Sequence, residues 1–530
     1  MTTAFHTLHR RIAFSAILSW LWLSPAAPRV HAQDAATLYI QEYRVQGVKQ
    51  LAQLEVETAV YPFLGPGRTT EDIEQARAAL EKAYHDKGFQ TVSINVPSQD
   101  GSYGIIFLEA VEASVGRLRV RGSRYFDIAA IKRKAPSLAE GSVPDFNKVQ
   151  RDMIALNSSA DRRVTPELKP GVVPGTVDID LKVEDKLPLH GSLELNNRYS
   201  PDTSAFRLNG ALSYGNLWQL GHTLGFNFQI APENLHDAEV FGAYYLAPLD
   251  EEWSVMLQAT QQDSDVSTLS GTAVAGRGEI YGIRFMRSLP GQDKFNHSLS
   301  FGIDYKHFDE DVIVAGERTL TPITYYPFSV NYAAAWAGAK GDTDLNLALN
   351  FHTRGLGSDK DEFDRKRYNS TGSYLYLRGD LSHTHELPHG LQLFTRLQGQ
   401  ASSAPLVNSE QFAGGGLGSV RGYLESTALG DHGIFGTLEL RSPSFITTKN
   451  KDKPEREWRV YGFIEGGRLS LSDPLKEQQP NTDMLSIGIG SNVRLFDHFN
   501  GSFDLGLPLV DAGVVSSGDV LLTFRLWLDF

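Results

Sequence analysis

A glycine-rich stretch toward the carboxyl terminus is the part of this sequence best suited to specific binding chemistry. Residues Phe412–Tyr423 read FAGGGLGSVRGY and contain a single cation, Arg421. Glycines let a backbone approach other surfaces closely and adopt positive φ angles. If this stretch is enclosed, Arg421 needs a carboxylate partner, because an unpaired buried charge is very costly. Glu465, which interrupts the apolar segment GFIEGG at residues 462–467, is the candidate partner.

Other patterns that resemble catalytic or metal sites lack the structural context that their chemistry requires. The segment His385–His389 matches HExxH, but Pro388 and Gly390 would break the helix that brings two zinc-binding histidines together. The glycine cluster is not followed by a helix, as a nucleotide-binding loop would be. The charged run Ser358–Arg367 is typical of a solvated surface loop. No nucleophile and base stand out as a pair, so we expect no enzyme, no metal site and no cofactor.

The residues that could enclose Arg421 come from Leu189–Phe530, where apolar and polar side chains alternate with a period of two. The last such segment places Leu522, Phe524, Leu526, Leu528 and Phe530 on one face and Thr523, Arg525, Trp527 and Asp529 on the other. We recognise about sixteen segments of roughly ten residues, the even number expected of a bacterial outer-membrane barrel. A water-soluble sandwich usually has strands of about 5–6 residues. It would also have to bury Glu194, Arg198 and Arg525, whereas a wet lumen would not.

Connection lengths between these segments alternate between short and long, which predicts the orientation of the barrel. Short turns are expected at 215–220, 247–252, 289–294 and 337–341, on the periplasmic side. Longer loops are expected outside, at 262–276, 308–321, 353–370 and 403–431. The stretch that contains Arg421 lies in the last of these, the sixth outward loop. Phe530 is an aromatic terminus of the kind that outer-membrane assembly machinery recognises.

Residues 38–187 contain the only credible helices, in a β-α-α-β-β order that occurs twice. The first copy has strands at 39–45, 91–96 and 103–111 and helices at 51–63 and 69–88; the second has strands at 117–120, 164–168 and 177–183 and helices at 127–135 and 145–156. The segments VQGVKQL (45–51) and VRGSRYF (120–126) occupy equivalent places. This internal repeat predicts two modules, at 38–114 and 115–187, before a barrel at 188–530.

Residues 1–32 have the pattern of a secretory signal peptide. Arg10 and Arg11 precede the apolar run Ile12–Leu23, and Val30 and Ala32 are small residues at the expected cleavage positions. A formal net charge of −13 argues against nucleic acid as the main partner, because phosphate binding needs a basic face. The absence of cysteine excludes a disulfide framework and a thiolate site.

Taken together, these features resemble the two-partner secretion transporters, the TpsB family of ShlB/FhaC/HecB-type haemolysin secretion/activation proteins. That family belongs to the superfamily that includes the barrel-assembly protein BamA. The two modules resemble polypeptide-transport-associated (POTRA) domains, including the Tyr84…Gly88-Phe89 ending of the long helix. The specific match is VRGY (Val420–Tyr423) in the sixth loop, followed by GFIEGG on the second strand after it.

The resemblance implies that the sixth loop folds into the lumen and that Arg421 meets Glu465 on the barrel wall. The alternation then places Tyr461, Phe463, Glu465 and Gly467 inward and Trp458, Val460, Gly462 and Ile464 toward lipid. Gly467 is expected to leave room for the loop backbone, and Phe463 and Tyr423 to pack beside the guanidinium. Val420 and Gly422 complete the supporting motif. The family acid is usually aspartate, so Glu465 is one methylene longer than the pattern.

The resemblance also implies a function without nucleotide hydrolysis: secretion of an unfolded partner exoprotein, haemolysin- or adhesin-like, through the barrel. The edges of the POTRA sheets would bind this client as an added strand. Outer-membrane lipid is a further partner, as are periplasmic chaperones and the barrel-assembly machinery during biogenesis; nucleic acid is not. Family members often carry a plug helix before the first module, for which Gln33–Thr37 leaves no room. The alternatives are an insertase that assembles barrels, as BamA does, and a passive porin.

Overall fold

The computed structural model describes residues 37–101, 103–269, 272–292, 294–309, 311–314, 317–446, 456–496 and 498–530. These residues form two compact units. The first combines the described residues up to Leu118 with 137–150 and 168–179, and the second combines 119–136, 151–167 and 180–530. The predicted signal peptide lies outside the described residues, as does all but Thr37 of the segment in which no plug helix is expected.

The first β-α-α-β-β copy is built on the long helix α2 (Thr70–Asp86). Thr69 begins it with a reciprocal cap, in which Asp72 N donates to the Thr69 hydroxyl and Thr69 N donates to the Asp72 carboxylate. Gly88 ends it with φ +100°, which an L side chain rarely adopts. The other elements are β1 (Leu38–Ile40), β2 (Glu42–Gln46), α1 (Gln53–Val60), β3 (Gly65–Arg68), β4 (Val92–Asn95) and β5 (Ile105–Glu112).

The buried side of α2 presents Ile73, Ala76, Leu80 and Tyr84 at helical spacing. Leu80 and Tyr84 pack against Val92, Ile94 and Leu108 of a three-stranded sheet with the order β2-β5-β4. The expected strand at 39–45 is divided in two, because β1 pairs with β3 and only β2 joins this sheet. The predicted element order is otherwise confirmed.

The second copy repeats the same order of elements. Its strands form a sheet with the order β6-β8-β7, and Asp127 begins the first helix by accepting a hydrogen bond from Ala130 N. The elements are β6 (Ser114–Arg121), α3 (Ile128–Arg133), α4 (Phe146–Leu156), β7 (Arg162–Pro170) and β8 (Thr176–Asp185). No helix among the described residues is long and apolar enough to cross a membrane.

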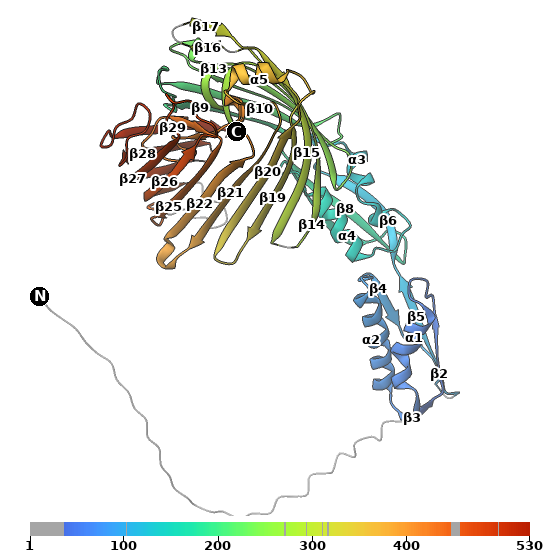
Figure 1. Cartoon of the computed structure of the whole chain (residues 1–530). Helices are drawn as coiled ribbons and strands as arrows, with labels where there is room; N and C mark the ends of the chain where they lie inside the picture. Colours follow the sequence, from blue (N-terminus) through green and yellow to red (C-terminus); the bar gives the residue numbers. More distant parts are fainter. Residues whose placement is uncertain are drawn as a thin grey trace, which may run out of the picture. The chain divides into compact units, whose positions relative to one another are not determined.

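The remainder of the chain forms a closed antiparallel barrel, in which each strand pairs with the next along the chain (Figure 1). Among the described residues the barrel has sixteen strand positions, since β18 and β19 both pair with β15 and share one of them. The strands are β9 (Leu189–Asn196), β10 (Arg207–Leu217), β11 (His222–Ile230), β12 (Ala238–Pro248), β13 (Trp253–Leu269), β14 (Thr272–Gln292), β15 (Phe295–Phe308), β18 (Ile323–Tyr325), β19 (Phe328–Ala337), β20 (Gly341–His352), β21 (Tyr374–Glu386), β22 (Gln392–Ser402), β25 (His432–Arg441), β26 (Glu457–Ser470), β27 (Asn481–Leu495), β28 (Phe499–Pro508) and β29 (Leu521–Asp529).

The barrel closes where β29 pairs with β9, with Leu526 opposite Leu195. Both guanidinium nitrogens Nε and Nη2 of Arg525 donate to the Glu194 carboxylate, at 3.0 and 2.7 Å, so an ion pair links the two strands. Both side chains lie on the inner face, as the alternation of the sequence predicts. The last and first barrel strands are therefore joined by backbone hydrogen bonds and by an ion pair.

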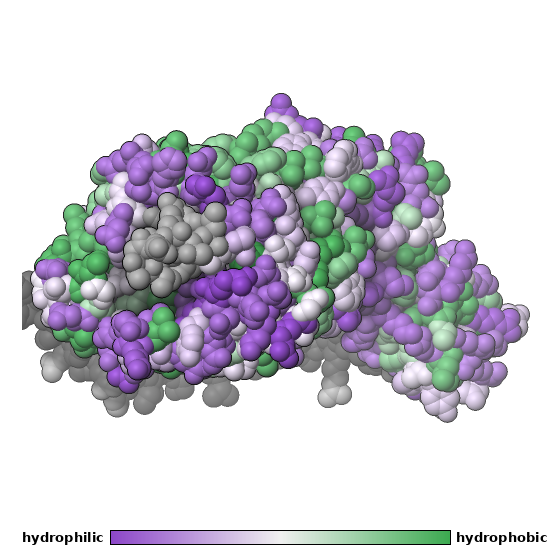
Figure 2. All heavy atoms as spheres, turned by 45° about the horizontal axis from the view of Figure 1, so that its top comes forward, coloured by the Kyte–Doolittle hydropathy of each residue, from purple (hydrophilic) through white to green (hydrophobic). Residues whose placement is uncertain are grey.

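Most connections at the two rims of the barrel differ in length as predicted, although the one between β25 and β26, 442–456, is long at the rim of short turns, and the one between β13 and β14 is short at the other rim. The rim with long connections bears α5 (Lys360–Lys366) and a hairpin of β16 (Asp311–Val314) and β17 (Glu317–Leu320), which lie together at the top of Figure 1. When this top is turned forward, hydrophilic residues dominate the near face and hydrophobic residues appear at its outer margin (Figure 2). The sixth connection at this rim spans residues 403–431, between β22 and β25.

Two expected loops are wrong in detail. Strands β13 and β14 continue through most of 262–276, so this segment is a strand hairpin. The charged run Ser358–Arg367 contains helix α5, because Asp359 and Glu362 cap each other and Phe363 is fully buried. By contrast, His385–His389 is the end of β21 and a short 3₁₀ turn, in which His389 has φ 64°. The expected absence of an α-helix there is confirmed.

We predict opposite responses to arginine at neighbouring positions in the middle of β20. Leu347 points to the outer face and Asn346 to the inner face. Leu347→Arg should destabilise the folded barrel by ~2–4 kcal/mol, as a cation does at the middle of the lipid-facing surface. Asn346→Arg, the matched control, should leave stability nearly unchanged because a wet lumen hydrates it. Urea unfolding of the two variants in lipid vesicles measures this, and equal losses would contradict the assignment of the faces.

Candidate functional site

The sixth loop, residues 403–431, is a hairpin whose glycines allow two sharp reversals of the backbone. Strands β23 (Phe412–Gly414) and β24 (Ala428–Gly430) pair with each other. Beyond them, Gly415, Gly416 and Gly422 have φ angles of +103°, +80° and +96°. Only glycine adopts such angles without strain, so the glycine-rich sequence is what lets the tip fold back on itself. Arg421 lies at the second reversal.

Arg421 is buried and makes three hydrogen bonds to Glu465 of β26. Its backbone N donates to Glu465 Oε2 at 2.6 Å, and its Nε and Nη2 donate to Oε1 at 2.9 and 2.6 Å. The longer glutamate side chain therefore reaches the guanidinium and the backbone of the loop together. The structure brings the two predicted residues into contact. The bonds to Glu465 hold both the guanidinium of Arg421 and its backbone in place.

Two further carboxylates, which the sequence analysis missed, complete the surroundings of Arg421. Its Nη1 donates to Asp504 Oδ1 of β28 at 2.9 Å, and its Nη2 donates to Glu439 Oε2 of β25 at 2.7 Å. Arg441 donates to the other oxygen of Glu439. All three acids are at most 4 % exposed. The same signal that selects Glu465, an acid inside an apolar alternating segment, is present at GTLEL (436–440) and SFDLG (502–506).

Aromatic rings of β26 line the side of the guanidinium. The Arg421 Cζ atom lies 3.7 Å from the centre of the Phe463 ring and 5.6 Å from that of Tyr461. Such a contact of a cation with a ring face adds to the ion pairs, and more so when it is desolvated. The Tyr461 hydroxyl also donates to Asp504 at 2.8 Å. Phe463 thus lies where it was expected.

Tyr423 lies elsewhere than expected. Instead of the guanidinium, it packs in an apolar cluster with Val420, Phe435 and Met484. Its hydroxyl donates to the backbone oxygen of Val510 at 2.6 Å. Val420 and Tyr423 therefore hold the loop through burial, on either side of the charged residue.

Glycines on the barrel wall make room for the loop, but not the one that was expected. A Cβ atom on Gly467 would lie 2.4 Å from Phe435 Cδ1 of the neighbouring strand, so Gly467 accommodates that ring and not the loop. The loop backbone is accommodated by Gly506 of β28. A Cβ atom there would lie 2.5 Å from Gly422 N and 2.7 Å from Gly422 Cα.

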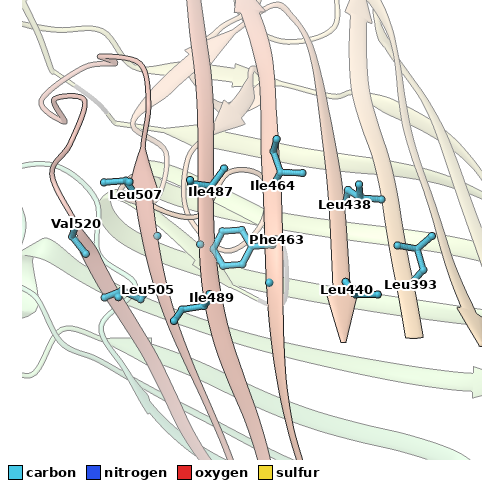
Figure 3. A pocket seen from close by; sticks show the side chains of 13 residues that line it. Leu393, Leu438, Leu440, Phe463, Ile464, Ile487, Ile489, Leu505, Leu507 and Val520 are labelled. Carbon is cyan, nitrogen blue, oxygen red and sulfur yellow. The ribbon is translucent and has the colours of Figure 1, made fainter. Parts of the chain in front are cut away.

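The barrel wall behind the Arg421 site is a single β-sheet, and its outer face is apolar. There, a hollow of about 680 Å³ is lined by aliphatic side chains that include Leu438, Ile464 and Ile487 (Figure 3). Gly462 contributes no side chain to this hollow. Trp458, Val460 and Ile464 are exposed on the outer face, and Tyr461, Phe463 and Glu465 are buried inside, so the predicted alternation of β26 is confirmed.

Fold and site together define a class: an outer-membrane β-barrel preceded by β-α-α-β-β modules, with a loop held inside by a buried arginine. A model of the haemolysin secretion/activation proteins ShlB/FhaC/HecB matches residues 175–493, and a model of the ShlB-type POTRA domain matches residues 38–113. The first match spans more than half of the chain. The protein belongs to the ShlB/FhaC/HecB family of two-partner secretion transporters, which places its barrel in the outer membrane and its POTRA domains in the periplasm.

Among curated proteins, the chain is similar to outer membrane transporter CdiB of Dickeya dadantii, with 24 % identity over 436 residues, covering 76 % of this chain and 72 % of that protein. CdiB of Escherichia coli is 22 % identical over 513 residues, covering 92 % and 82 %. Among solved structures, Escherichia coli CdiB has a TM-score of 0.63 at 20 % identity, covering 96 % of this chain and 93 % of that one. BamA of Haemophilus ducreyi lacking POTRA domains 1–3 has a TM-score of 0.57 at 13 % identity, covering 93 % and 100 %. These structures share the fold.

We predict that Gly506→Ala loosens the loop without altering any charged group. The added Cβ atom would overlap the backbone at Gly422, so the loop must move away from β28 and Arg421 with it. Overpacking of this kind typically costs ~1–3 kcal/mol. Trypsin cleavage after Arg421, which is buried in the unaltered protein, should become faster. Gly462→Ala is the matched control, since its Cβ atom would open onto the outer hollow, 3.9 Å from the nearest atom. Equal cleavage rates in the two variants would contradict this role of Gly506.

Proposed function

We propose that this transporter secretes a partner exoprotein through its lumen, and that the sixth loop must leave its place to let the client pass. The observation that carries the proposal is the bonding of Arg421 to three carboxylates of the inner wall. A buried charged cluster holds a segment firmly only while its geometry is complete. The loop is therefore a blocking element held in one defined position by bonds that can be exchanged.

These bonds of the loop tip join it to neighbouring strands on one side of the barrel, since β22 pairs with β25 and β25 with β26. Arg421 bonds to carboxylates of β25, β26 and β28. On β22, the side chains of Arg396 and Gln398 donate to the Gly418 carbonyl at 3.0 and 2.7 Å. A chain that crosses the lumen must displace both sets. Bonds of this kind can be replaced by polar groups of an extended client, so that displacement does not leave the wall charges unpaired.

We further propose that the client binds the first POTRA domain, residues 38–114, before it enters the barrel. In the sheet β2-β5-β4, strand β4 pairs with β5 alone among the described residues. An extended peptide can add to such an edge through main-chain hydrogen bonds, which recognise an unfolded chain independently of most of its sequence. The second module, 115–187, would then pass the client to the barrel at 188–530.

The export step would use no nucleotide. The periplasm lacks ATP, so the free energy has to come from the client, which folds once it is outside. The haemolysin- or adhesin-like character of the client rests on the family alone. Insertion of other barrels, the activity of BamA, is the competing function, and it predicts a defect in outer-membrane proteins in place of a defect in secretion.

Removal of either member of the Arg421–Glu465 pair should reduce secretion with the barrel still folded, because the loop then loses the defined position from which the client displaces it. Breaking a buried pair costs ~3–5 kcal/mol, whereas the strand ladder does not depend on one loop contact. We expect Arg421→Ala and Glu465→Ala each to reduce export about tenfold or more, and the double variant to add little, as partners in one interaction do. The measurement is exoprotein in the medium, normalised to folded barrel in the membrane. Strictly additive losses would show that the two residues act separately.

Arg421→Ala should be the more severe of the single variants. It leaves Glu465, Glu439 and Asp504 without their shared cation, whereas Glu465→Ala leaves Arg421 with the other two acids. Unchanged secretion combined with fewer barrels in the outer membrane would favour the insertase instead.

Deletion of Asp34–Val111 should stop export while the barrel still inserts into the membrane. The first POTRA domain has a core built around Leu80, Tyr84 and Leu108, and its strands take no part in the ladder of the barrel. Secreted exoprotein and the heat-dependent gel mobility of the barrel are the two measurements. Normal export from this deletion would remove the first domain from the proposed path.

A further inference from the structure

The sixth loop has another point of attachment to the wall besides Arg421. It is the buried carboxylate of Glu410, eleven residues before Arg421. Glu410 is 2 % exposed. Its Oε1 accepts hydrogen bonds from Lys306 Nζ of β15 at 2.6 Å and the Tyr325 hydroxyl of β18 at 2.7 Å, and its Oε2 accepts one from the Tyr376 hydroxyl of β21 at 2.7 Å. One side chain of the loop thus joins three strands of the wall.

The returning end of the loop is anchored in the same manner by Asp431, which is fully buried. Its Oδ1 accepts from Leu406 N at 2.8 Å, which ties the two ends of the loop together. Its Oδ2 accepts from Ser472 N of the seventh loop (471–480, between β26 and β27) at 2.7 Å. The same oxygen faces Arg367 of the fifth loop (353–373, between β20 and β21), next to α5, at 3.5 Å. The two ends of the sixth loop are therefore fixed to each other and to both neighbouring loops.

The segment that contains Glu410 is stiff and partly buried. Residues 403–411 read SAPLVNSEQ, with a proline and no glycine. Leu406 and Val407 are buried in a cluster with Tyr325, Phe363 and Tyr376. Proline restricts the backbone, and burial in a close-packed cluster opposes displacement.

The tip, residues 415–427, differs in its glycine content and in its charged attachments, although Val420 and Tyr423 also bury it against the wall. It contains Gly415, Gly416, Gly418 and Gly422. Its attachments to the wall include the Arg421 cluster, the Gly418 carbonyl and an ion pair of Glu425 with Arg198, at 2.7 Å. Backbone freedom and exchangeable polar bonds thus coincide in the tip, and the β23–β24 ladder separates it from the anchored ends.

We propose that the sixth loop consists of a fixed base, residues 403–411 with Asp431, and a movable tip, residues 415–427, and that opening of the lumen displaces the tip alone. Glu410 and Asp431 are the positioning residues of the base, and Arg421 is that of the tip. The hinge is the β23–β24 ladder. The inference rests on the proposed transport function for its purpose, but the division of the loop can be measured without a client.

The sequence contains no cysteine, so spin labels attach only to the cysteines that are introduced. One protein carries spin labels at Lys340→Cys and Gly418→Cys, which reports the tip; a second carries them at Lys340→Cys and Asn408→Cys, which reports the base. Lys340, in a short turn, is the shared reference, and all three positions are exposed. A Cβ atom on Gly418 meets nothing within 4 Å. Distances between labels are measured by pulsed electron paramagnetic resonance on the full chain in lipid vesicles.

With Arg421→Ala, the tip distance should shift and broaden while the base distance keeps its position and width. Arg421→Lys, which keeps the charge but loses the forked donors, should act in the same direction and serves if the alanine variant does not fold. Broadening of both distances would show that the whole loop leaves, and broadening of neither would show that Arg421 does not hold the tip. Either result would overturn the proposal.

With Glu410→Ala, the base distance should broaden. The double variant Tyr325→Phe with Tyr376→Phe removes two of the three donors, keeps both rings, and should broaden it less; it also serves if the alanine variant does not fold. A base distance that stays narrow in these variants would overturn the role of Glu410.

Glu477→Gln, which changes an exposed acid of the seventh loop, is the matched control. Broadening there would show that loss of any acid at this rim loosens the loop, and would equally overturn the proposal. The label distances are measured without a client, so they do not depend on whether the protein secretes an exoprotein. The division of the loop and the proposed transport function can therefore be contradicted separately.

Discussion

The burial of one guanidinium inside the barrel is the constraint on which the rest of the site depends. Arg421 cannot be taken out of water unless acids replace its hydration, and a single strand cannot supply them in every direction. Glu439, Glu465 and Asp504 come from β25, β26 and β28, so the curvature of the wall is what makes them converge. The glycines at 488, 490 and 506 follow from the same need, because the inner face must admit Phe463, Tyr461 and the loop backbone.

This arrangement makes the position of the loop sensitive to small changes of geometry. Acids outnumber the two arginines that they contact, Arg421 and Arg441, and are nearly inaccessible to water. If Arg421 moved without a replacement, the wall would keep uncompensated negative charge in a poorly hydrated place, which is unfavourable. The position of the loop is therefore stable when the lumen is otherwise empty, and a polar or cationic chain within the lumen lowers the cost of displacing it.

Sequence alone predicted what depends on regular periodicity and on single, unusual residues. The strand alternation gave the barrel and its inner and outer faces, and an acid inside an apolar segment identified Glu465. Glu439 and Asp504 carry the same signal, but the family pattern directs attention to one acid, and only the register of four strands shows that three acids meet. Gly467 was assigned the wrong neighbour because alternation fixes the face of a residue and leaves its cross-strand contacts open; the ring of Phe435 fills that space.

Helix α5 was missed for a different reason. Lys360–Lys366 is too short and too charged for periodicity to reveal it, and its stability depends on the burial of Phe363 and on the contact of Arg367 with Asp431. Both contacts are tertiary. Likewise, Glu410 and Asp431 look like ordinary loop acids in the sequence, since the partners described above, apart from Leu406, lie 34 to 104 residues away on strands or in other loops.

The closure of the barrel has a consequence for its folding kinetics. The ion pair of Arg525 and Glu194 joins residues 331 positions apart, so β9, the first barrel strand to be made, waits for the last one. Pairings of such high contact order form slowly, because the entropy of closing the chain is lost before the contact forms. Throughout that interval β9 presents an unpaired edge, the kind of surface that templates aggregation. The pairing of β29 with β9 is therefore the barrel contact of highest sequence separation, and the edge of β9 stays open until it forms.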